Sequence, residues 1–78
     1  MKITQYFQFR RQMPDRVEIT DEMIESVLKS PLKTETQEDG RMKVWGRVDE
    51  AGEKILRVIL LEDGMTVHNA FFDRNFKE

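Results

Sequence analysis

The chain has 78 residues, a formal net charge of −2, 36% charged residues and no cysteine. Its length limits it to a single domain, residues 1–78, which buries only about 60% of the surface of its unfolded form. The absence of cysteine excludes disulfide bridges and thiolate zinc sites. With one histidine and no acidic cluster of suitable spacing, we expect no metal and no cofactor.

The charges and the apolar residues are distributed as in a soluble domain. No apolar run is long enough to span a bilayer and no signal-peptide pattern opens the chain, so we expect a cytoplasmic location without membrane contact. Acidic residues gather at 15–25, whereas arginines precede this stretch and recur along the second half of the chain. The distribution fits either a basic face on a nearly neutral protein or scattered, solvated charge.

The first part of the chain predicts an extended start and one helix. Residues 1–9 are rich in Ile, Thr, Tyr and Phe, which favours a short strand or an extended arm, and Pro14 then interrupts regular structure. Thr20 or Asp21 can cap a helix that ends at Pro31. Apolar residues share one face of this helix at three- and four-residue spacing: Met23, Ile24, Val27 and Leu28, with Ile19 packing back onto them.

After Pro31 the apolar pattern changes to a period of two. Four strands are predicted, at 32–37, 41–48, 55–61 and 65–72. The copies of Glu-Asp-Gly at 38–40 and 62–64 favour three-residue hairpin turns with a left-handed glycine and an adjacent bulge. Because short loops join neighbouring strands, the expected fold is α+β, with one main helix on a four-stranded antiparallel meander.

The two faces of the predicted sheet differ in composition. With three-residue turns, the even face is mostly apolar and should pack against the helix; it holds Leu32, Thr34, Met42, Val44, Val48, Leu56, Val58, Leu60, His68 and Ala70. The odd face is half apolar, and it holds Lys43, Trp45, Arg47, Ile55, Arg57, Ile59, Val67, Asn69 and Phe71. The N-terminal arm, the C-terminal tail or a partner must cover the apolar half of the odd face. A two-residue turn at 63–64 would instead move His68 to the odd face.

His68 and Arg57 are the candidate catalytic residues. An imidazole titrates near neutrality and suits a general acid or base, although a lone histidine on a strand often has a structural role. Arg57 lies within an otherwise apolar strand, where a guanidinium needs a partner. It can bind a phosphate bidentately, or it can form a salt bridge to a neighbour such as Glu35 or Asp73.

Other side chains are candidate contacts to RNA or phosphate. Trp45 is flanked by Lys43 and by Arg47, which is itself a candidate phosphate contact, so Trp45 can stack on an RNA base or cover the apolar half of the odd face. Asn69 can orient a phosphate by hydrogen bonding, or satisfy backbone groups at a strand end. Arg74 can reach a phosphate or a carboxylate, or form an ordinary surface ion pair.

Three segments of the chain resemble a known group of proteins. "RVEITDEMIESVLKSP", "EDGRMKVWG" and "LRVILLEDGMTVHNAFFDRNF" resemble a family of small bacterial and archaeal proteins grouped with the barnase-, EndoU-, colicin- and RelE-like nucleases. The resemblance covers about residues 7–76 and implies the compact α+β fold of RelE-type ribonuclease toxins. This chain departs from the family pattern in two places. Many relatives carry a histidine in the first segment, where this chain has Phe7. RelE-type toxins are usually basic, whereas this chain has a net charge of −2.

The resemblance implies a function and its residues. Arg10, Arg16 and Arg57 would hold the scissile phosphate and offset its developing charge. His68, beside Asn69, would assist attack by the RNA 2′-hydroxyl, so that no metal is needed. The implied function is a toxin-type endoribonuclease of a toxin–antitoxin pair, with an antitoxin and RNA or the ribosome as partners. The alternative is a non-catalytic protein-interaction module or a small homo-oligomeric domain, since an uncovered apolar sheet favours a partner.

Overall fold

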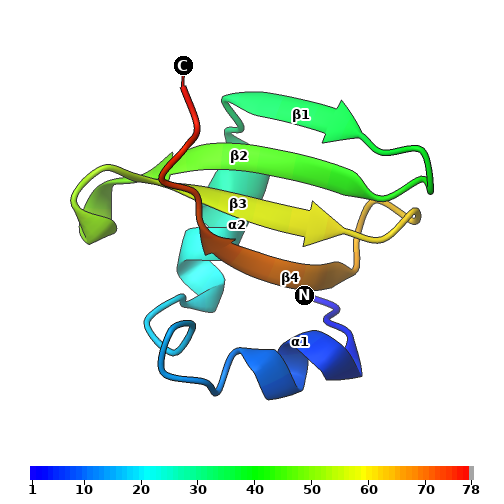
Figure 1. Ribbon diagram of the computed structural model, residues 1–78, viewed down its shortest axis with the longest axis horizontal. Coiled ribbons are helices and arrows are strands. Elements are labelled where there is room, and N and C mark those ends of the chain that lie inside the picture. The colour runs from blue at the N-terminus through cyan, green and yellow to red at the C-terminus, as the bar shows by residue number, and fades with distance from the viewer. Residues whose placement is uncertain (78) are drawn as a thin grey trace.

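The computed structural model describes residues 1–77, apart from the side chain of Glu50. It confirms the predicted α+β class, with a four-stranded antiparallel sheet in the order β1–β2–β3–β4 (Figure 1). The strands are β1 (Lys33–Thr36), β2 (Met42–Val48), β3 (Lys54–Leu60) and β4 (Val67–Phe72), and a 3-10 turn, η1 (Asp49–Ala51), joins β2 to β3. The helices are α1 (Gln5–Arg10) and α2 (Asp21–Lys29).

Helix α2 forms where the sequence predicts it. The Thr20 hydroxyl accepts a hydrogen bond from the Met23 amide at 3.2 Å and so caps the first turn. Ile24 and Val27 are buried against β2 and β3. At Gly46 of β2 the helix is so close that an added Cβ would lie 3.0 Å from the methyl groups of Val27. Glycine at this position therefore allows the helix and the sheet to pack closely.

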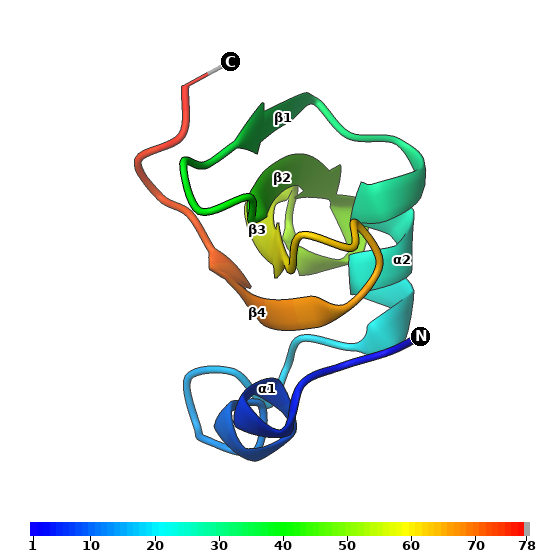
Figure 2. The ribbon, with the colours of Figure 1, turned by 90° about the vertical axis from the view of Figure 1, so that its right-hand side faces the viewer.

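The core lies between the sheet and the two helices, with α2 on one face and α1 beside β4 (Figure 2). Its buried residues are Phe7, Ile19, Ile24, Val27, Val44, Val48, Leu56, Val58, Leu60, Val67 and Ala70. Most of them belong to the predicted even face and the predicted helix face. Leu32 and Thr34 were expected on the covered face but are exposed, because α2 packs mainly over β2 and β3.

The predicted strand or extended arm at 1–9 is wrong beyond Thr4, where the chain turns into α1. The Thr4 hydroxyl accepts a hydrogen bond from the Phe7 amide at 3.1 Å, and the Phe7 side chain is fully buried. Before α1 the chain runs parallel to β4: Val67 donates its N–H to the Lys2 carbonyl at 2.8 Å, and Thr4 donates to the Val67 carbonyl at 3.0 Å. Burial of one aromatic ring thus stabilises a helix too short to form alone.

A bulge in β4 places His68 differently from either predicted turn. Leu60 pairs with Val67 and Ile59 pairs with Asn69, so His68 is the extra residue. The expectation that His68 shares the covered face and Val67 the odd face is therefore wrong. Val67 is fully buried in the core, whereas His68 is only partly buried at the outer edge of the sheet.

Both Glu-Asp-Gly segments form turns with a left-handed glycine, as predicted, with φ of +91° at Gly40 and +70° at Gly64. In the second turn the Asp63 carboxylate accepts hydrogen bonds from the Thr66 hydroxyl at 2.5 Å and from the Met65 and Thr66 amides at 2.9 Å. These bonds lower the pKa of Asp63 to about 2. The carboxylate consequently holds the turn closed at neutral and mildly acidic pH.

The odd face is covered by the end of the chain itself. Residues 73–77, called the tail below, cross the side of the sheet opposite α2 (Figures 1 and 2). Phe76 stacks on Trp45 with ring centroids 5.5 Å apart. Trp45 is therefore only 6% exposed, so its role in the folded chain is packing. The C-terminal tail is one of the three segments or partners predicted to cover the odd face, and it covers Trp45.

Candidate functional site

Trp45, Arg57 and Asp73 form a hydrogen-bonded cluster on the odd face, called the Asp73 network below. Arg57 donates from Nε and Nη2 to Asp73 Oδ2 at 3.1 and 2.7 Å. The Trp45 indole N–H donates to the same oxygen at 3.0 Å. The Trp45 and Arg57 donors hold the pKa of the Asp73 carboxyl below its ordinary value. Asp73 thus neutralises Arg57, which is the salt bridge considered from the sequence as the alternative to phosphate binding.

Aromatic rings enclose the Arg57 guanidinium within this network. Cross-strand pairing places Trp45 and Phe71 on either side of Arg57. The guanidinium carbon lies 5.3 Å from the centre of the Trp45 ring and 5.0 Å from that of Phe71. The Arg57 side chain is 27% exposed and that of Asp73 only 7%. Arg57 therefore serves first to join the tail to the sheet.

His68 contacts α1 and the residues just before it. Its Nδ1 lies 3.2 Å from the Thr4 hydroxyl oxygen, and its ring stacks on Tyr6 with centroids 5.0 Å apart. Burial, followed by the positive charge of Arg41, lowers the pKa of His68 below its ordinary value. The ring is consequently neutral at neutral pH and helps to hold the N-terminal segment against β4.

We expect His68 to make the stability of the protein depend on pH. Because its pKa in the folded state lies below the ordinary value of about 6.5, folding disfavours the protonated ring. The stabilisation is present above about pH 6.5 and is lost as pH falls through the folded-state pKa. Urea unfolding of the wild type and of His68→Gln between about pH 7 and pH 5 measures this effect. The wild type should lose more stability than the variant, and parallel curves would contradict the prediction.

The structure does not bring His68 and Arg57 together. Phe71, the cross-strand neighbour of Arg57, is three residues from His68 along β4, which corresponds to about 10 Å. The two side chains also have different partners, α1 for His68 and the tail for Arg57. The candidate catalytic pair therefore does not converge on one reacting group.

The predicted phosphate-binding residues Arg10 and Arg16 share one carboxylate. Arg10 binds Asp15 bidentately, with both bonds 2.9 Å long, and holds the pKa of Asp15 below its usual value. Arg16 Nη1 donates to Asp15 Oδ2 at 2.5 Å, and its guanidinium lies over the Phe71 ring at 5.3 Å. Both arginines thus order residues 11–20, called the connecting segment below, and Arg16 holds this segment against the sheet.

The other predicted contacts lie at separate places. Arg47 is exposed near the end of β2, and Asn69 is half-buried in β4, where its Oδ1 accepts a hydrogen bond from the Ala70 amide at 2.9 Å. Arg74 is exposed in the tail. Of the predicted phosphate contacts, Arg16 and Arg74 line one common groove.

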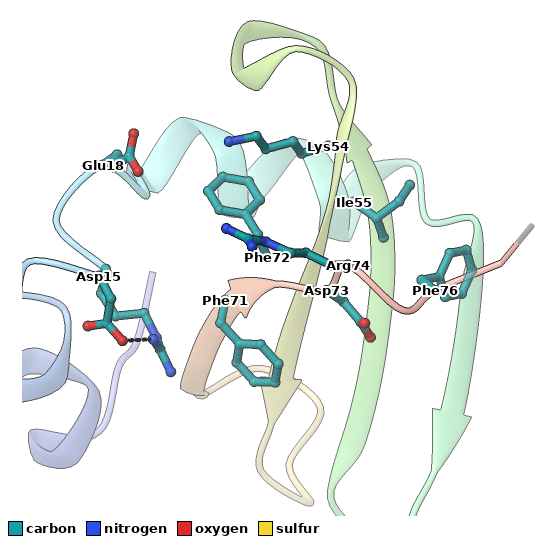
Figure 3. Close-up of a pocket in the computed structure, with 10 residues that line it drawn as sticks. Asp15, Glu18, Lys54, Ile55, Phe71, Phe72, Asp73, Arg74 and Phe76 are labelled. Carbon is teal, nitrogen blue, oxygen red and sulfur yellow. Dashed lines mark hydrogen bonds and ion pairs between the residues drawn. The ribbon is translucent and has the colours of Figure 1, made fainter.

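This groove has a volume of about 580 Å³ and lies between the connecting segment and one end of the sheet (Figure 3). It is lined by the connecting segment, by the start of β3, by the end of β4 and by the tail. In Figure 3, Lys54 and Arg74 both extend toward the segment that carries Asp15 and Glu18. The Lys54 ammonium lies 5.4 Å from the centre of the Phe72 ring.

The sequence does not predict a functional role for three charged residues that line the groove: Asp15, Glu18 and Lys54. The sequence gives one usable signal, because Asp15 stands directly beside Arg16 after a proline break. Lys54 precedes the apolar run of β3 and looks like an ordinary solvated charge. Only the docking of the connecting segment beside the sheet places these residues around one groove.

The fold and this groove define a small α+β protein with a meander sheet and a solvent-open, partly cationic groove. Among the described residues, no helix is long and apolar enough to cross a membrane. Comparison with protein-family models, with curated proteins and with solved structures finds no match for this chain. The RelE-like assignment accordingly stays a prediction from the sequence.

Proposed function

We propose that this chain is a non-catalytic protein-interaction module that binds a segment of a partner protein in the groove. One observation carries the proposal: the candidate catalytic residues have separate structural partners, whereas two cations of the groove, Lys54 and Arg74, have no carboxylate partner among the described residues. Arg57 is neutralised by Asp73 and His68 contacts Thr4. Among the described residues, neither Lys54 nor Arg74 has a carboxylate partner.

The size and the walls of the groove support this proposal. A volume of about 580 Å³ lies within the range of roughly 300–1,000 Å³ found for ligand pockets. The β3 and β4 walls are held by the ladder of the sheet, and the connecting segment is held by ion pairs of Arg10 and Arg16. A preordered surface loses little conformational entropy on binding. If the resemblance to toxin-type domains holds, the antitoxin is the natural partner.

Selection from a random peptide library tests the proposal. Peptides displayed on phage are selected against the wild type and against the double variant Lys54→Glu/Arg74→Glu, whose fold is checked by circular dichroism. We expect peptides that bind the wild type and not the double variant. Peptide pools that bind both proteins equally, or no enrichment at all, would count against the groove as a protein-binding site.

Ribonuclease activity is a second candidate, favoured by the state of His68. Its ring is partly exposed and neutral at neutral pH, as a general base requires. The cation that lowers the pKa of His68 is Arg41 rather than Arg57. Growth and bulk RNA integrity during expression of the intact chain and of His68→Ala test this candidate. Growth arrest with RNA cleavage that His68→Ala abolishes would support it, and intact RNA at high expression would oppose it.

A further inference from the structure

The groove combines an apolar wall with a cationic edge. Ile55, Phe72 and Phe76 line it together with Lys54 and Arg74. Ile55 and Phe72 are only partly buried, so the folded chain leaves part of their apolar surface uncovered. A ligand that fills this groove must therefore offer both an apolar group and a negatively charged group.

The charges around the groove favour an anionic ligand. Among the described side chains that line it or bond to its walls, the cations are Arg10, Arg16, Lys54, Arg57 and Arg74, and the carboxylates are Asp15, Glu18 and Asp73. They leave an excess of two positive charges on a chain whose formal net charge is −2. The Asp15 and Asp73 carboxylates already accept hydrogen bonds from arginines, so they offer little to a cationic ligand.

The aromatic rings of the groove distinguish a peptide from a nucleic acid. Single-stranded nucleic acid binds by stacking its bases on exposed aromatic faces. Here Arg16 and Arg57 lie over the Phe71 ring, and Lys54 lies over the Phe72 ring. Because cations of the chain occupy these rings, flat bases would have to displace them. A carboxylate that reaches Lys54 and Arg74 leaves the rings as they are.

We infer that the groove binds a short peptide segment of a partner protein in which aspartate or glutamate stands beside a large apolar side chain. The inference rests on the proposed function and specifies the chemistry of its ligand. The apolar side chain packs on the part of Phe72 that Lys54 leaves uncovered. The carboxylate pairs with Arg74, whose guanidinium can bind it bidentately, and with Lys54.

The peptides enriched by phage display against the wild type provide the test. We expect them to share an acidic residue next to Leu, Ile or Phe. For the strongest peptide, synthesised with a fluorescent label, replacing Asp or Glu by Asn or Gln should weaken binding about two- to fivefold per carboxylate, as for exposed ion pairs. Arg74→Glu should weaken binding at least as much, and a peptide with Lys in place of the acid should regain affinity for Arg74→Glu.

A matched control and two opposing outcomes complete the experiment. Lys29→Glu makes the same charge reversal as Lys54→Glu in the last turn of α2, outside the residues that line the groove, and should leave binding unchanged. Groove-dependent peptides that are neutral or basic would overturn the inferred ligand and leave the proposed function standing. Absence of groove-dependent peptides, with a labelled oligouridine binding the wild type and not Arg74→Glu, would overturn both in favour of nucleic acid.

Discussion

Replacement of Phe7 by alanine is expected to lower the free energy of unfolding by about 3–5 kcal/mol. Phe7 is fully buried and is the one buried residue of α1. It anchors the helix to β4, and its removal leaves a cavity that six helical residues cannot close. The total stability expected for 78 residues is only about 4–12 kcal/mol, so the loss is a large fraction of it. Urea denaturation followed by circular dichroism measures the effect.

Phe9→Ala is the matched control for this prediction. Phe9 lies in the same helix but is 63% exposed, so its removal should change stability by no more than about 0.5 kcal/mol. If Phe7→Ala does not fold, Phe7→Leu keeps the experiment informative, with an expected loss of about 1–2 kcal/mol. Hydrogen exchange at the Val67 amide, which bonds to the Lys2 carbonyl, should accelerate in the Phe7 variants alone. Equal effects of the Phe7 and Phe9 replacements would show that α1 is not held by Phe7.

Asp73→Ala is expected to destabilise the protein by about 3 kcal/mol, because Arg57 and Trp45 then lose their shared acceptor within a partly apolar environment. In a domain of this size that corresponds to a fall in Tm of about 15 °C. The fluorescence of Trp45 should also change, because its indole N–H loses the Asp73 carboxylate and because the tail no longer holds Phe76 against the indole ring. Thermal unfolding and tryptophan emission measure the two effects.

A double-mutant cycle separates loss of the network from loss of the side chain alone. Arg57→Met removes the cation from the middle of β3, between Leu56 and Val58, so Asp73→Ala should be much less harmful in that background. Asp73→Asn retains an acceptor oxygen without charge and should fall between the wild type and Asp73→Ala. Strictly additive effects of Arg57→Met and Asp73→Ala would contradict the idea that this ion pair holds the tail.

The sheet could be predicted because its signals are local. Alternating apolar residues, the Glu-Asp-Gly turns and the Thr20 cap each act over a few neighbouring residues, and the strands and α2 form close to the predicted boundaries. The N-terminal segment was mispredicted because its aromatic residues suit a strand, whereas the buried Phe7 selects a helix. The sequence predicts the second bulge beside Gly64, whereas burial of Val67 in the core makes His68 the extra residue of β4.

The candidate site was predictable only in part. Arg57 and Trp45 stand out in the sequence, and Asp73 was one of the partners considered for Arg57. Lys54 and Glu18 carry no local signal, because a charge beside an apolar run is ordinary on any surface. Arg16 and Arg74 are distant in sequence and line the same groove only because the connecting segment and the tail both pack on the sheet.

The sequence by itself determined the secondary structure of most of the chain, the order of the strands and the apolar face that α2 covers, because each depends on short-range periodicity and turn chemistry. Tertiary structure alone decided the partners of Arg57 and His68, the cover over Trp45 and the existence of the groove. These features depend on which distant segments pack together. A guanidinium or an imidazole takes whichever partner the completed fold places within hydrogen-bonding distance.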